Sequence, residues 1–181
     1  MTLKFALDEN DYLQHQLYLA SISNNIKSQR KRSLITVVLA FLVLAFLFFQ
    51  TEKKWWMYYF VALSILSVIF YPFYLQRYYK RHYRKHISDT YKNRFNEPCT
   101  IIFNEASIED IDKSGETKMD MSAIEEIVET GSYVYLRIKT GGSLIIPKSK
   151  IEDPDNLLTY LRALSGTLKI KYSQELNWKW K

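Results

Sequence analysis

The stretch that decides the fold is a pair of apolar runs, LITVVLAFLVLAFLFF at residues 34–49 and WWMYYFVALSILSVIFYPFYLQ at residues 55–76. Neither run contains a charged residue, and only residues 50–54 separate them. A bilayer core requires about 17–25 apolar residues in a helix, because a helix satisfies its own backbone hydrogen bonds in hydrocarbon. The two runs therefore predict a transmembrane helical hairpin over residues 34–76.

Basic residues gather at the two ends of this hairpin that lie away from its short loop. They are Lys27, Arg30, Lys31 and Arg32 before the first run, and Arg77, Lys80, Arg81, Arg84 and Lys85 after the second. The loop carries only Lys53 and Lys54, beside Glu52. Because positive charge collects on the cytoplasmic side, we expect a two-pass protein of the cell (inner) membrane with both termini cytoplasmic. The first apolar run begins too deep in the chain for a cleaved signal peptide.

The hairpin divides the rest of the chain into four predicted segments. They are a cytoplasmic N-terminal segment and helix (1–33), a basic juxtamembrane helix (77–96), a β domain with a C-terminal helix (97–166) and a basic, aromatic tail (167–181). We expect the N-terminal segment to begin extended and to open its helix near Asp8 and Asp11, since acidic residues suit a helix N-terminus. We expect Pro98 to end the basic helix, because proline has no amide to donate and disfavours helical angles before it.

The segment 97–166 has the pattern of an antiparallel meander. Short runs rich in Ile, Val, Tyr and Thr occupy residues 99–104, 107–112, 117–121, 124–129, 133–140 and 143–147. Turn signals at Gly115, Gly131 and Gly141 separate several of them. Pro154 then predicts the first turn of a helix that Asp153 caps and that ends before Gly166. The predicted fold class is thus an α+β membrane protein: a two-helix transmembrane hairpin plus a small antiparallel β domain closed by a C-terminal helix.

Few residues in the chain offer catalytic chemistry. Cys99 is its one cysteine, and residues 97–181 contain no histidine to act as a base for it or to complete a hydrolytic triad. We interpret Cys99 as a strand residue facing inward together with Ile101 and Phe103. Residues 97–165 carry thirteen acidic side chains, but nothing in their spacing marks a catalytic pair.

Two patterns resemble metal sites, and both have simpler interpretations. His82 and His86 stand four residues apart on the expected basic helix, where neighbouring arginines and lysines would repel a cation. The run Asp110, Asp112, Ser114, Gly115 and Glu116 resembles the start of a calcium loop, but Met121 stands where the bidentate glutamate belongs. We interpret this run as a hairpin turn that needs Gly115, and we expect neither a metal nor a cofactor.

Residues 77–94 interleave basic and aromatic side chains next to the second apolar run. Grooves for single-stranded nucleic acid use the same composition, but beside a membrane span it indicates an interfacial belt. We therefore expect no nucleic acid and assign Arg77, Lys80, Arg81, Arg84 and Lys85 to contact with the anionic headgroups of the bilayer. The tail around Trp178 and Trp180 is either a second contact of this kind or a strand or loose tail.

The order of parts, with the runs 124–129, 133–136 and 144–148, resembles the YcxB-like family of bacterial membrane proteins. That family often has a tryptophan just before the first of these runs, where this chain has Met119 and Met121. The resemblance implies a pleckstrin-homology-like (PH-like) fold for residues 97–166 and gives no catalytic residue to carry over. By analogy with small bacterial membrane proteins that have comparable domains, it also suggests a role in immunity.

These observations favour a non-enzymatic inner-membrane protein whose cytoplasmic PH-like domain is a binding or scaffold module. Its expected partners are the lipid bilayer and a protein or peptide of unknown identity, and homo-oligomerisation is left open. The alternative is a self-immunity protein against a membrane-active peptide or toxin. An unrecognised enzyme is the least favoured interpretation.

Overall fold

The computed structural model describes residues 1–113 and 115–180, and these form two compact units. The β unit comprises residues 1–15 and 86–179, and the hairpin unit comprises residues 16–85 together with Trp180. The helices are α1 (Glu9–Ile22), α2 (Asn24–Phe49), α3 (Lys54–Tyr91) and α4 (Pro154–Leu168). The chain crosses between the units within α1, within α3 and, outside any helix, between Lys179 and Trp180.

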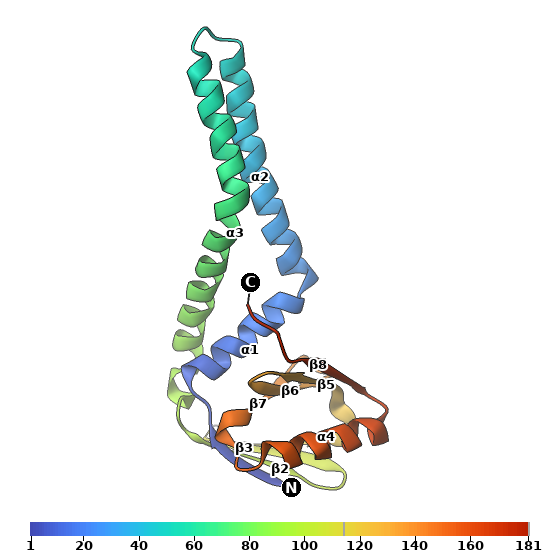
Figure 1. Cartoon of the computed structure of the whole chain (residues 1–181). Coiled ribbons are helices and arrows are strands. Elements are labelled where there is room, and N and C mark those ends of the chain that lie inside the picture. The colour runs from blue at the N-terminus through green and yellow to red at the C-terminus, as the bar shows by residue number, and fades with distance from the viewer. Residues whose placement is uncertain (114, 181) are drawn as a thin grey trace. The chain divides into compact units, whose positions relative to one another are not determined.

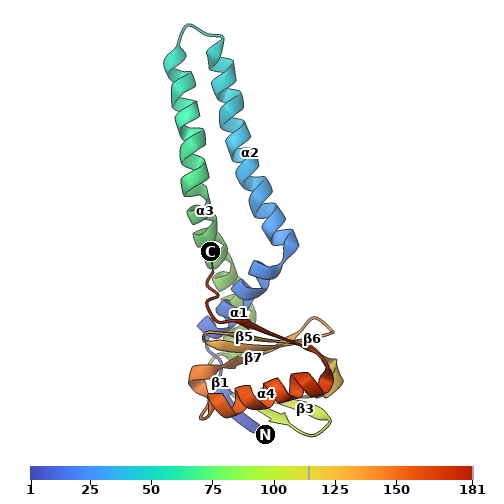
Figure 2. The ribbon, with the colours of Figure 1, turned by 45° about the vertical axis from the view of Figure 1, so that its right-hand side comes forward.

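In the hairpin unit, α2 and α3 lie side by side and are joined by a short loop (Figures 1 and 2). Both helices are long and apolar enough to cross a membrane. Small side chains, Ala45 on α2 and Ser64 on α3, are buried, and the hydroxyl groups of Ser33 and Tyr71 lie 2.6 Å apart. Small residues and polar links of this kind allow helices to pack where water does not drive them together.

The first sheet of the β unit is antiparallel and draws on both ends of the unit. Its strands are β1 (Thr2–Ala6), β2 (Pro98–Phe103), β3 (Ser107–Asp112) and β4 (Gly115–Asp120), in the order β1-β2-β3-β4. β1 comes from the predicted N-terminal segment and pairs with β2, with Leu3 opposite Ile101. The extended start of the chain is therefore part of the β unit.

The second sheet contains one parallel ladder. Its strands are β5 (Ile124–Thr130), β6 (Tyr133–Ile138), β7 (Ser143–Pro147) and β8 (Lys171–Glu175), in the order β7-β6-β5-β8. The ladders within residues 97–166 are antiparallel, as predicted, whereas β8 comes from the predicted tail and pairs parallel to β5. The reason is topological: α4 carries the chain back along the sheet before β8 begins, as parallel pairing requires.

The core of the β unit lies between the two sheets and α4. Ile101 and Ile108 of the first sheet, Ile127 and Val134 of the second and Leu161 of α4 belong to one buried cluster. Figure 2 shows the two sheets as layers with α4 (orange) along their open side. The six strands predicted between residues 99 and 147 are confirmed, as is the helix that Asp153 caps.

Two predicted helix ends are wrong. The last α-helical residue of α3 is Tyr91, before Pro98, and a short 3-10 helix (Lys92–Arg94) follows. Asn96 then adopts a left-handed φ of 59°, and its N–H donates to the carbonyl of Leu7, the residue after β1. The helix has therefore ended before the chain reaches Pro98. Gly166 lies inside α4, and Lys169 supplies the left-handed cap with a φ of 55°. The amide of the next residue, Ile170, donates to Ser165, which satisfies a terminal carbonyl of α4.

Candidate functional site

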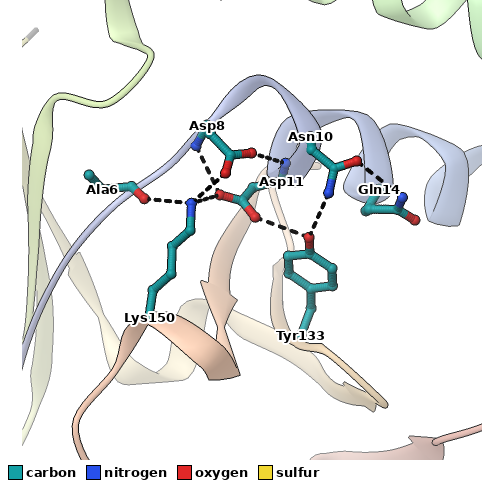
Figure 3. A network of polar contacts seen from close by, with 7 residues as sticks. All are labelled: Ala6, Asp8, Asn10, Asp11, Gln14, Tyr133 and Lys150. Atoms are coloured by element: carbon teal, nitrogen blue, oxygen red, sulfur yellow. Dashed lines mark hydrogen bonds and ion pairs between the residues drawn. The ribbon is translucent and has the colours of Figure 1, made fainter.

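An ion-pair cluster fixes the start of α1 to the second sheet; we call it the N-terminal cluster, and it consists of Asp8, Asp11, Tyr133 and Lys150. The ammonium group of Lys150 lies 2.7 Å from Asp8 Oδ2 and 2.6 Å from Asp11 Oδ2 (Figure 3). It also donates to the carbonyl of Ala6 at 3.1 Å. The Tyr133 hydroxyl donates to Asp11 Oδ1 at 3.0 Å. Residues from β1, α1, β6 and the turn after β7 therefore meet at one partly buried point, with Asp11 and Tyr133 on its buried side.

The sequence around Asp8 explains why α1 begins there. The backbone N–H of Asp11 donates to Asp8 Oδ1 at 3.0 Å, and the N–H of Asp8 donates to Asp11 Oδ2 at 2.9 Å. This reciprocal arrangement is a capping box built with two aspartates, and carboxylates also suit the positive end of the helix dipole. Lys150 offsets the repulsion between the two carboxylates.

The surroundings of the cluster shift the pKa values of Asp8, Lys150 and Tyr133. Burial raises the pKa of Asp8, but hydrogen bonds from Lys150 and the Asp11 amide outweigh this effect and lower its pKa. Burial lowers the pKa of Lys150, but Asp11 and Asp8 outweigh it and raise its pKa. Burial and the adjacent Asp11 carboxylate raise the pKa of the Tyr133 hydroxyl. Asp8 is therefore ionised at neutral pH, whereas Lys150 and the Tyr133 hydroxyl keep their protons.

A second buried carboxylate, Glu129 on β5, is the centre of what we call the Glu129 cluster. Only 4% of its side chain is exposed, and Lys148 donates to its Oε1 at 2.9 Å. Its Oε2 accepts from Tyr172 at 2.8 Å, from Gln174 at 3.0 Å and from Arg162 at 3.2 Å. Since Tyr172 and Gln174 belong to β8 and Arg162 to α4, one carboxylate fixes both elements to the sheet.

The hydrogen bonds to Glu129 dominate its titration. Burial raises the pKa of this carboxyl, but the donors Lys148, Gln174, Tyr172 and Arg162 outweigh burial and lower the pKa to about 2. A carboxylate that accepts several charge-assisted hydrogen bonds is held in its ionised form. Glu129 is therefore charged at any physiological pH and fully occupied by donors of its own chain.

One short turn serves both clusters. Lys148 and Lys150 lie at the two ends of the 3-10 helix Lys148–Lys150, directly after β7. In a 3-10 helix with three residues per turn, side chains two positions apart point in different directions. Lys148 thus reaches Glu129, whereas Lys150 reaches Asp8 and Asp11.

The residues predicted to contact lipid headgroups all lie on α3, within the hairpin unit. Arg77, Lys80, Arg81, Arg84 and Lys85 are exposed, and they lie apart in sequence and in structural unit from both clusters. Near the start of this stretch, Trp180 donates from its indole N–H to the carbonyl of Gln76 at 3.3 Å. The Gln76 amide donates back to the Trp180 carbonyl at 2.7 Å, and the Arg30 guanidinium lies 5.1 Å from the centre of the indole ring.

The other candidate residues have environments that favour a structural role. The Cys99 thiol donates to Asp110, and burial together with this carboxylate raises the pKa of Cys99 to about 12. Burial lowers the pKa of His15 to about 4. His82 stacks on Tyr78. Among residues 1–113 and 115–180 no three potential ligands gather as a metal site would require, and Ser114 of the calcium-like run lies outside the described residues.

The sequence analysis did not predict the two clusters, although the sequence contains a local feature at each of them. Asp8 and Asp11 were interpreted only as helix-start residues, yet their three-residue spacing is that of a capping box. Glu129 is the last of three glutamates in β5, and Lys148 and Lys150 follow the buried Pro147. No local signal indicates that these lysines meet carboxylates far along the chain.

The fold and its clusters define an α+β protein with a helical hairpin long and apolar enough for two membrane spans and with a β unit tied together by buried ion pairs. Residues 103–164 match the sequence profile of the family described as YcxB-like protein. The matched region includes Glu129, Tyr133, Lys148, Lys150 and Arg162, but not Asp8 or Asp11. No curated protein and no solved structure matches the chain.

Proposed function

We propose that this chain is a non-enzymatic, two-pass protein of the inner membrane whose β unit is a cytoplasmic module for binding or scaffolding. One observation carries the proposal: three ionisable groups that could serve in catalysis, those of Glu129, His15 and Cys99, are each held in one protonation state at neutral pH. The pKa of Glu129 is lowered to about 2, that of His15 is lowered to about 4, and that of Cys99 is raised to about 12. General acid–base catalysis needs a pKa near the working pH, so these groups suit a rigid scaffold.

The arrangement of the β unit supports the further proposal of a PH-like fold. Two sheets enclose one core, and α4 closes it from the side. In this proposal β1 and β8 extend the domain expected at residues 97–166 at the edges of its two sheets.

The proposed topology follows from the hairpin and its charges. The two helices are joined by a four-residue loop, residues 50–53, so two spans would leave both chain termini on one side of the membrane. The basic residues at the other helix ends favour the cytoplasm for that side. Reporter fusions at residue 1 and at residue 181 test this, and a reporter active in the periplasm at either end would contradict the topology.

In the same proposal, the five exposed basic residues of α3 contact anionic headgroups. Each basic residue near an anionic surface contributes about 1 kcal/mol, within a screening distance of about 8 Å at physiological salt. Contact with the headgroups would hold the start of the cytoplasmic part of α3 at the membrane surface.

Hydrogen exchange of the full chain in lipid nanodiscs tests the headgroup contact. We expect residues 77–85 to exchange more slowly in anionic than in neutral lipid, and the difference to disappear at high salt. Changing all five basic residues to glutamine should abolish the difference. The matched control changes five exposed lysines of the β unit to glutamine and should preserve it; these are Lys113, Lys118, Lys139, Lys169 and Lys179. Equal exchange in both lipids would contradict the lipid role.

A further inference from the structure

The strand β1 forms an open edge of the first sheet. Met1 and Phe103 exchange two backbone hydrogen bonds, of 2.9 Å and 2.8 Å. In an antiparallel ladder such pairs alternate, so the N–H and C=O groups of Leu3 and Phe5 also face β2. Those of Thr2 and Lys4 face the opposite way, out of the sheet edge.

This edge lines a groove of about 570 Å³. One wall consists of β1 residues, including Thr2 and Lys4, and the other of the segment that leads into α4, including Glu152, Asp153 and Asn156. In the described part of the chain, no backbone group of Thr2 or Lys4 pairs across this groove. The next outward carbonyl, that of Ala6, already accepts a hydrogen bond from Lys150.

The charges around the groove indicate which kind of chain it fits. Glu152 and Asp153 line the wall opposite β1 and are exposed, and the exposed Asp155 follows in the first turn of α4. The other wall contributes Lys4 and the ammonium group of Met1, which donates to the carbonyl of Phe103. An unpaired strand edge offers alternating donors and acceptors to an extended backbone. The acidic wall adds attraction for basic side chains on such a segment.

We propose that β1 is a docking edge to which a partner protein adds an extended, basic segment as a further strand, seated between β1 and the start of α4. The inference deepens the proposed binding role by naming its site and the chemistry of its partner, and it rests on that role. Backbone bonds to Thr2 and Lys4 supply the affinity, and Glu152 and Asp153 select for lysine or arginine.

Substitution at Lys4 tests the edge without breaking the sheet. The N–H of Lys4 faces the groove, so Lys4→Pro removes one docking donor while leaving the bonds of Leu3 and Phe5 to β2 in place; proline is tolerated at such edge positions. The matched control, Lys4→Ala, keeps the N–H and removes only the side chain. The probe is a heptapeptide of alternating valine and lysine, titrated onto the full chain in nanodiscs of neutral lipid.

We expect Lys4→Pro to weaken binding of the probe about tenfold and Lys4→Ala to leave it unchanged or slightly tighter. Glu152→Gln combined with Asp153→Asn should also weaken it, as should replacing the probe lysines by glutamate or methylating alternate backbone nitrogens of the probe. Hydrogen exchange should show protection of Thr2 and Lys4 when the probe binds, and unchanged protection of β2 in Lys4→Pro confirms that the sheet is intact.

Equal binding by Lys4→Pro and Lys4→Ala would overturn the docking edge, as would the absence of probe binding to the unaltered chain. Equal binding of the glutamate peptide would overturn the basic partner. A dimer of the unliganded chain that is lost in Lys4→Pro would assign the edge to a second copy and overturn the peptide proposal. None of these results alters the reporter and lipid measurements, so failure of the docking edge and failure of the proposed function are distinguishable.

Discussion

The hairpin unit and the β unit use the same apolar residue types with opposite exposure. In the β unit, Ile127 and Leu161 are 0% exposed, whereas Phe46 and Phe70 of the hairpin unit are 62% and 63% exposed. Water drives the first pair into a core, because burying apolar area releases about 25 cal/mol per Å². A bilayer exerts no such force between helices. The difference teaches that apolar residues stabilise the β unit by packing against one another, whereas in the hairpin unit they would act through contact with the bilayer.

The charges of the two units differ in the same way. The β unit buries Asp11 and Glu129 and satisfies each with groups from distant strands. The hairpin unit keeps its basic residues exposed along α3. Three kinds of substitution test this comparison: at a packed core residue, at a buried carboxylate and at an exposed apolar residue of the hairpin unit.

The largest effect is expected from a cavity in the core. Leu161→Ala removes a fully buried side chain of α4 and should lower the free energy of unfolding of the β unit by about 2–5 kcal/mol. Hydrogen exchange of β5 and β6 amides in the full chain in detergent micelles measures this. Leu176→Ala, at an exposed leucine of the β unit, is the control and should change little. A cost below that of the control would mean that α4 does not close the core.

Loss of the Glu129 charge should have the next largest effect on the free energy of unfolding. Glu129→Gln keeps the shape but leaves Lys148 and Arg162 without their carboxylate, which should cost about 3 kcal/mol of unfolding free energy. The strand β8 should show the greatest increase in hydrogen exchange, since two of the four donors lie on it. Glu125→Gln, which alters an exposed ion pair with Arg137, should cost less than about 1 kcal/mol.

Asp11→Asn should lower the free energy of unfolding by about 2 kcal/mol, because it removes the charge from the hydrogen bond that Lys150 donates and weakens the one that Tyr133 donates. Faster exchange should concentrate in the first turn of α1 and in β1. The control Asp155→Asn changes an exposed aspartate in the first turn of α4 and should cost less than about 1 kcal/mol. Similar costs for the two variants would show that the N-terminal cluster does not fix α1.

Low pH should remove the contribution of Glu129 to the stability of the β unit. Because its pKa is lowered from 4.5 to about 2 on folding, its stabilisation is complete above the unfolded pKa and is lost as the pH falls through the folded pKa. The stability difference between the unaltered chain and Glu129→Gln should therefore shrink between pH 4.5 and about pH 2. Chemical unfolding of both proteins across that range measures it, and a constant difference would contradict the assignment.

The smallest effect is expected at the apolar surface of the hairpin unit. Phe46→Ala, in a chain reconstituted in a bilayer, should change the unfolding free energy of the β unit by less than about 0.5 kcal/mol, since this exposed ring packs little within the protein. The same hydrogen-exchange measurement serves as for Leu161→Ala. A cost comparable to Leu161→Ala would show that Phe46 packs against protein and would break the comparison between the two units.

The sequence by itself determined the local elements of this protein. Two uncharged runs were enough to predict α2 and α3, because helix length and composition report directly on an apolar solvent. Alternation and turn residues likewise predicted β2 to β7, and Asp153 with Pro154 predicted the start of α4. These signals are read within a few residues, so they do not depend on what the rest of the chain does.

The tertiary structure alone decided which distant segments meet. β1 lies beside β2 although the whole hairpin separates them in sequence, and β8 lies parallel to β5 after α4 has returned the chain. Lys150 joins Asp8 across 142 residues and Tyr172 joins Glu129 across 43. The physical reason is that a lysine or an aspartate in the sequence does not show whether it will face water or a buried partner. Burial of its charge costs free energy unless a partner is present, and only the closure of the sheets around one core brings that partner within reach.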